Sequence, residues 1–210
     1  LNTVNREGWQ RNVADPSAIA ASADLPAGAG FPWPYGKESA NRRLGSQNST
    51  EWRASFDAKL TDNLQNYLIY QGAHFKSNGP HTQLPFVLPT SGSCTYEPFA
   101  QKQRESDFWS TQAAWRIPTN LKQHQLVDTL TLDLGNITLK NIAGAKWIDR
   151  RAGIDSTGTP ASMAQNVIND YVQSGHGFSE EFQIQGRSPD SGLSWTVGAF
   201  YFYNKIKQSI

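Results

Sequence analysis

Apolar and polar residues alternate one by one along several stretches of the chain. In residues 52–60, Trp52, Phe56 and Leu60 share one parity with two alanines. The other parity holds Arg53, Ser55, Asp57 and Lys59. Side chains alternate between the faces of a strand, so this stretch predicts a strand with one apolar and one charged face. Alternation alone does not decide whether the apolar face packs inward in a soluble protein or meets lipid in a membrane barrel.

Further stretches show the same period of two, at residues 64–75, 126–134, 137–150, 178–187 and 193–205. Short connections at 61–63, 135–136 and 188–192 alternate with long ones at about 9–50, 76–122 and 151–177. In an antiparallel up-and-down meander, alternate connections lie at opposite ends of the sheet. One end is then tightly turned, and the other carries the long loops. Compact soluble domains mostly use short connections throughout, whereas outer-membrane barrels combine short turns with long outer loops.

One stretch departs from this strand pattern. Residues 159–175 place Ala161, Ala164, Val167 and Tyr171 near helical spacing, which predicts a short helix. The fold class indicated by the other stretches is all-β, an antiparallel meander that forms part of a large transmembrane barrel with long loops on one side.

Aromatic residues bracket the apolar face of the last predicted strand, with Trp195 near the short turn and two tyrosines toward the loop end. Amphipathic rings at both ends of an apolar stretch are typical of the two membrane interfaces. We therefore expect lipid to be met by Trp52, Phe56, Trp195, Val197, Tyr201 and Tyr203. We expect the lumen to be lined by Arg53, Asp57, Lys59, Glu181 and Arg187.

Charge and cysteine content narrow the function classes. The chain has 19 basic and 18 acidic residues with no basic stripe, which argues against nucleic-acid binding. Cys94 is the single cysteine, so no disulfide forms within the chain, and zinc spacings are absent. No apolar run approaches the ~18 residues of a membrane-spanning helix, whereas a barrel strand needs only about 9–11 residues, half of them apolar.

Catalytic and metal-binding patterns are also absent from the sequence. The histidines, His74, His81, His124 and His176, lack ligand spacing, and we expect them in solvated loops. Glu180 and Glu181 are neighbours on one predicted strand, so they point to opposite faces and cannot flank one bond. No serine elbow or phosphate loop is present. We therefore expect a protein that is not an enzyme and holds no cofactor.

Four stretches carry a resemblance to a known family, and they occur in the family's order. "REGWQRN" (6–12) resembles the end of an early barrel strand, and "WRASFDAKLTDNLQNYLIY" (52–70) resembles the hairpin after it. "LDLGNITLKNIAGAKWIDR" (132–150) and "FSEEFQIQGRSPDSGLSWTVGAFYFYNK" (178–205) resemble the two hairpins that follow. Together they resemble the front part of the barrel of TonB-dependent outer-membrane receptors. The TonB box, the plug domain and a final strand ending in Phe are not seen, and "AKWIDR" replaces the more usual aromatic–Arg pair.

The resemblance implies a transporter of the bacterial outer membrane. Such a protein imports a scarce solute (a siderophore, a vitamin or an oligosaccharide) through a barrel filled by its own plug domain, and it draws energy from TonB. Residues 1–210 would supply about six strands plus a partial one, as an internal piece of a longer protein embedded in the lipid bilayer.

Two further interpretations remain beside the transporter. The long loops place Trp33, Tyr35, Trp109 and Trp115 where they could contact a ligand, although aromatic residues in long loops also pack such loops together. A soluble β-sandwich that binds carbohydrate through aromatic loops is the alternative function. A repetitive structural or adhesive surface protein is a third, weakened because no repeat is found.

Overall fold

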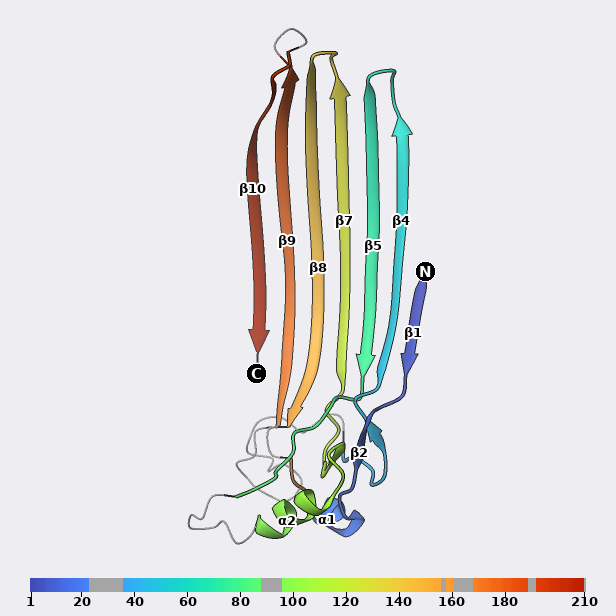
Figure 1. The fold of residues 1–210 in the computed structure, drawn as a ribbon, viewed down its shortest axis with the longest axis vertical. Coiled ribbons are helices and arrows are strands. Elements are labelled where there is room, and N and C mark those ends of the chain that lie inside the picture. The colour runs from blue at the N-terminus through green and yellow to red at the C-terminus, as the bar shows by residue number, and fades with distance from the viewer. Residues whose placement is uncertain (23–35, 88–95, 156–157, 161–167, 189–191, 210) are drawn as a thin grey trace.

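The computed structural model describes residues 1–22, 36–87, 96–155, 158–160, 168–188 and 192–209. Its main feature is one antiparallel sheet (Figure 1). The strands are β1 (Asn2–Arg6), β4 (Gln47–Lys59), β5 (Leu64–Ser77), β7 (Thr119–Asp133), β8 (Ile137–Asp155), β9 (Ile168–Arg187) and β10 (Ser194–Ser209). From β4 onward the strands run for 13 to 20 residues, longer than the 3–10 residues usual in globular proteins.

The sheet is an up-and-down meander, because its spatial order β1-β4-β5-β7-β8-β9-β10 keeps the order of the chain. The three hairpins β4–β5, β7–β8 and β9–β10 turn at one end, and the long connections leave from the other end (Figure 1). The described residues are therefore mostly β, and they form the predicted antiparallel meander with the long connections on one side (Figure 1). Each hairpin pairs in continuous register, for example from Asn48↔Lys76 to Lys59↔Gln65.

The predicted helix at 159–175 is wrong for its second half. Residues from Ile168 onward belong to β9, which pairs with β8 as far as Asp155↔Ile168. Ala161, Ala164 and Val167 lie outside the described residues. Tyr171 is in the strand, where it pairs with Ala152, so the strand ladder overrode a weak helical spacing.

The described parts of the long connections fold into a cap at the loop end of the sheet (Figure 1). The cap contains α1 (Pro16–Ala21), α2 (Glu97–Glu105) and a small sheet of β3 (Arg43–Leu44), β2 (Gln10–Asn12) and β6 (Ser110–Thr111). The most deeply buried side chains described lie here rather than on the large sheet, among them Leu44, Ala100, Ala113, Ala114 and Ile117.

Buried amide side chains tie the cap segments together. Asn12 Nδ2 donates to the carbonyls of Ser39 and Ala113 at 3.0 and 2.9 Å, and Asn12 Oδ1 accepts from the amides of Ala14 and Ala113. Gln10 exchanges two 2.8 Å hydrogen bonds with the backbone of His81. Side-chain amides replace strand partners that these short segments lack, so the cap is a packed unit rather than a set of independent loops.

The N-terminus of α1 is capped by Asp15. The Ser17 hydroxyl and backbone amide donate to its Oδ1 at 2.7 and 2.8 Å, and they hold the pKa of the Asp15 carboxyl below its ordinary value of 3.8. This stabilisation is present at neutral pH and is lost as the pH falls through the lowered pKa. No helix in the described part of the chain is long and apolar enough to span a bilayer.

Candidate functional site

The pairing register divides the large sheet into two faces, because directly paired residues lie on the same side. We call the face that holds Trp52 the apolar face. Its members on β10 follow from the ladder, and they include Trp195, Val197, Tyr201 and Tyr203. The six residues expected to share the lipid side therefore do share one face. The five residues expected in the lumen, Arg53, Asp57, Lys59, Glu181 and Arg187, share the opposite one, which we call the polar face.

The apolar face carries a band between two cross-strand rows, which we call the aromatic rows because each contains at least one tryptophan. Near the short turns, the Trp195 row contains Ile137, Gly186 and Trp195. Near the cap, the Trp52 row contains Trp52, Gly72, His124, Trp147 and His176, and it ends at Lys205 on β10. Between the rows lie Phe56, Leu68, Leu126, Leu130, Leu132, Leu139, Phe178, Phe182, Ile184 and Val197, among others.

The side chains of this band are open to the surroundings. Phe56 is 62% exposed and Val197 is 64% exposed, and no described element packs against this face. Beyond the Trp52 row toward the cap, the same face becomes charged, with His74, Lys122, Asp149 and Lys207 in one row. The apolar surface is thus a bounded stripe across the strands rather than a scatter of exposed residues, and such a patch calls for an apolar neighbour.

In each aromatic row a tryptophan lies over a glycine of the neighbouring strand. Trp52 pairs directly with Gly72, and a Cβ placed on Gly72 would lie 2.3 Å from the indole Cζ2. Trp195 pairs with Gly186, and a Cβ placed on Gly186 would lie 2.2 Å from Cζ2 of the Trp195 indole. Glycine weakens a strand interior unless something must approach closely, and here an indole ring does. The two glycines let both rings lie flat on the sheet.

The three histidines of the sheet were expected in solvated loops, and that prediction is wrong. His74, His124 and His176 lie in β5, β7 and β9, and the fourth, His81, is buried in the cap. His124 Nδ1 is hydrogen-bonded to the Tyr70 hydroxyl at 2.7 Å, and its ring meets Trp52 edge-on at 5.7 Å. These partners make His124 part of the aromatic row, where an amphipathic ring is suited to a boundary between apolar and aqueous surroundings.

Two polar pairs interrupt the middle of the band. Asn66 Nδ2 donates to Asp128 Oδ1 at 2.7 Å, and Asn141 Nδ2 donates to Glu180 Oε1 in a short hydrogen bond. Each pair joins diagonal neighbours on adjacent strands, and all four residues lie on the apolar face. Each carboxyl is thus bonded to an amide, which reduces the cost of removing both groups from water. The face of Glu180 could be read from its parity in the sequence, but its partner is shown only by the register.

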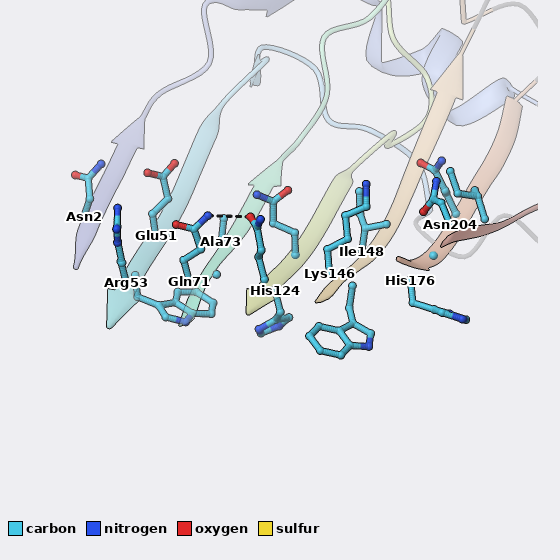
Figure 2. Close-up of a pocket in the computed structure, with 18 of the residues that line it drawn as sticks. Asn2, Glu51, Arg53, Gln71, Ala73, His124, Lys146, Ile148, His176 and Asn204 are labelled. Atoms are coloured by element: carbon cyan, nitrogen blue, oxygen red, sulfur yellow. Dashed lines mark hydrogen bonds between the residues drawn. The ribbon is translucent and has the colours of Figure 1, made fainter. Parts of the chain in front are cut away.

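A hollow of about 750 Å³ lies on the polar face, toward the cap. Residues of all seven strands line it, so the sheet curves around this side. Its polar lining includes Glu51, Arg53, Gln71, Lys146 and Asn204. Gln71 Nε2 donates to Gln125 Oε1 at 2.9 Å across β5 and β7, and Figure 2 shows Gln71 and Lys146 on one side of the strands with His124 and His176 on the other.

Nearer the short turns, the polar face continues with paired side chains. Gln65 Nε2 donates to Asp57 Oδ1 at 2.7 Å, and Gln183 Nε2 donates to Glu181 Oε1 at 2.5 Å. The face is not wholly polar, since Ile69, Val127 and Ile142 form a small apolar group at its centre, with Phe200 and Phe202 on β10. A concave, mostly polar surface with a local apolar patch can hold water and also contact a packed domain.

The cap holds buried ionisable groups. His81 Nδ1 lies 3.5 Å from Asp155 Oδ2, and both side chains are buried. Glu38 is buried and accepts hydrogen bonds on Oε1 from Arg42 Nη1 and the Ser39 amide, both at 2.9 Å. These groups join the end of β8 and the segments around β2 and β3. Among the described residues, no three His, Cys, Asp or Glu side chains gather as metal ligands.

The aromatic residues predicted as ligand contacts have different surroundings. Trp33 and Tyr35 lie outside the described residues. Trp115 forms an isolated bridge with Lys37, whose ammonium lies 5.7 Å from the indole centroid. Trp109 is exposed and touches Trp9 and Phe108, two residues that the sequence did not single out. The neighbouring aromatic residues "FW" at 108–109 could have indicated a cluster at this point of the sequence. The contact with Trp9 could not be predicted, because Trp9 is a hundred residues away along the chain.

No protein-family profile, no curated protein and no solved structure matches this chain.

Proposed function

We propose that this chain forms part of the wall of a TonB-dependent transporter in the bacterial outer membrane, with the apolar face toward lipid. The observation that carries the proposal is the height of the apolar band. On β8, Ile137 belongs to the Trp195 row and Trp147 to the Trp52 row. The two residues are ten positions apart, which is about 33 Å along a strand. At the ~40° tilt of membrane barrels this gives about 25 Å, the height of their lipid-facing band.

The two faces also differ as the wall of a barrel requires. Glu51, Arg53, Lys59 and Lys146 lie on the polar face, and the hollow on that face supports an inward-facing role for it. In a barrel this side faces water and a plug, and the apolar group of Ile69, Val127 and Ile142 is a natural contact for that plug. The short turns then lie on the periplasmic side and the cap on the outside.

A soluble sandwich is the less favoured alternative, for a reason that the structure supplies. In a sandwich the apolar face of each sheet is covered by a second sheet about 10 Å away. The small cap sheet is not stacked on the band, whose aromatic and aliphatic side chains remain exposed. Edges β1 and β10 would be paired in the barrel by further strands of the same protein, since unpaired strand edges are not tolerated in lipid.

The test places a spin label on neighbouring positions of the full-length protein in vesicles, with Cys94 replaced by serine. A nitroxide at Val197 is expected to collide mainly with oxygen, which concentrates in lipid. The same label at Thr196 is expected to collide mainly with a water-soluble nickel chelate. Fractionation of cells provides the second measurement, and the protein is expected with the outer membrane. A soluble protein, or labels at Val197 and Thr196 with equal accessibility to both reagents, would overturn the proposal.

A further inference from the structure

The cap carries an exposed cluster of three aromatic rings, Trp9, Phe108 and Trp109. The ring centroids of Trp9 and Trp109 are 5.2 Å apart with planes at 86°, and those of Phe108 and Trp109 are 4.8 Å apart at 82°. Despite these contacts, Trp9 is 50% exposed, Phe108 is 73% exposed and Trp109 is 55% exposed. Aromatic residues that only hold loops together bury their rings, whereas these three leave large parts of their surfaces open.

The backbone beneath the rings is held by the cap core. The Arg11 amide donates to the Trp109 carbonyl at 2.8 Å, and the Trp109 amide donates to Asp107 Oδ1 at 2.9 Å. Gln83 Nε2 donates to the Phe108 carbonyl at 2.7 Å. On either side, Gln10 and Ser110 are buried. The rings are therefore mounted on ordered backbone, so a ligand that stacks on them would lose little affinity to ordering the cluster.

The position of the cluster excludes acyl chains as its neighbour. Trp9 follows Asn5 by four residues, and Asn5 pairs with Asn48, which is four residues beyond Trp52 toward the cap. The four strand residues from Trp52 to Asn48 already span about 13 Å, and β1 ends at Arg6, so Trp9 lies beyond the strand, in the cap. The rings thus lie well past the Trp52 row and past the charged row that follows it. In the proposed transporter this is the external aqueous layer.

One exposed polar side chain suited to hydroxyls, that of Arg11, belongs to the residue whose backbone amide is bonded to Trp109. Gln10 and Asn12 are buried while Trp9 and Arg11 are exposed, so Arg11 projects from β2 on the same side as Trp9. The Arg11 guanidinium donates to Asn41 Oδ1 at 3.1 Å on the surface. Its remaining N–H groups are directional donors on the exposed side of β2. A pyranose ring has the matching chemistry, with C–H groups on its faces and hydroxyls around its rim.

We infer that Trp9, Phe108 and Trp109, with Arg11 at their edge, form a carbohydrate-binding platform on the cap. The inference deepens the proposed function and rests on it for placing the cap outside the cell. The ligand of the platform is an oligosaccharide. Its sugar rings stack on the indoles, and Arg11 donates hydrogen bonds to their hydroxyls.

The experiment uses the full-length protein in detergent and an array of oligosaccharides of glucose, galactose, mannose and xylose. The tightest binder is then titrated against the variants Trp9→Ala, Trp109→Ala and Phe108→Ala. We expect each to weaken binding at least tenfold. Phe86→Ala is the matched control, since Phe86 is another exposed aromatic residue outside the cluster, and it should bind as wild type. If a tryptophan variant fails to fold, Phe108→Ala still tests the platform, because Phe108 is the most exposed of the three residues and its loss removes the fewest internal contacts.

Failure of the platform is distinguishable from failure of the transporter. An outer-membrane protein that binds no oligosaccharide on the array, or that binds equally well without the rings, overturns the platform alone. A soluble protein whose oligosaccharide binding depends on Trp9 and Trp109 overturns the transporter and leaves the platform standing. Arg11→Lys retains the charge but not the fork of donors, so intermediate affinity in that variant supports the assigned hydrogen bonds.

Discussion

Arginine substitutions along β10 test the assignment of the faces most directly. Val197 lies two residues beyond Trp195, and Ala199 lies four residues beyond it, both on the apolar face. Along a strand tilted by ~40°, these positions are about 5 and 10 Å from the Trp195 row. Ala199 is therefore the closer of the two to the centre of a band about 25 Å high. Thr196 lies on the polar face beside them.

The expected cost follows from depth. Arginine on the lipid face of a barrel costs about 2–4 kcal/mol at the midplane and about 0–1 kcal/mol near an interface. We expect about 2–4 kcal/mol for Ala199→Arg, an intermediate loss for Val197→Arg and at most about 0.5 kcal/mol for Thr196→Arg. All three residues are exposed, so contacts within the protein give no reason for this order.

The assay is reversible folding of the full-length protein into lipid vesicles, with urea titration followed by tryptophan fluorescence. Free energies of unfolding for the three variants are compared at one lipid composition. Equal losses at Thr196 and Ala199 would refute the argument, because only an apolar neighbour outside the sheet distinguishes the two positions. A larger loss at Thr196 would place lipid on the other face.

Three further outcomes test other parts of the structure. Gly186→Ala should cost about 1–3 kcal/mol and shift the emission of Trp195, because its Cβ displaces the indole; an unchanged spectrum would show that the ring does not lie over this glycine. Asn141→Leu should lower the free energy of unfolding by about 1–3 kcal/mol, because it leaves the Glu180 carboxyl unpaired. The double variant Asn141→Leu with Glu180→Leu should recover most of that loss when the four proteins of the cycle are unfolded in urea, and additive losses would contradict the pair. Asn12→Ala should cost about 3 kcal/mol or more and open the cap to limited trypsin digestion while the sheet stays protected; an equally resistant cap would mean that Asn12 does not join its segments.

Local pattern determined most of the strands and the faces of their residues, although it placed the starts of β7 and β9 seven and ten residues too late. The alternation in 52–60 and 193–205 is a property of neighbouring residues, and side chains on a strand must alternate, so the parity of Trp52, Arg53 and Val197 could be read directly. The short turns and their common end followed from chain order alone. The same local logic failed for 168–175, where a weak helical spacing lost to pairing with β8.

Only the tertiary structure decided how distant residues combine. The register aligned the aromatic rows into a band of definite height, placed Trp195 over Gly186 and joined Asn141 to Glu180. The cap brought Trp9 beside Trp109, a hundred residues away. Alternation fixes which side a residue takes but not its level on that side, because level depends on the pairing of strands. Folded loops have no period at all, so their contacts arise only when the chain packs.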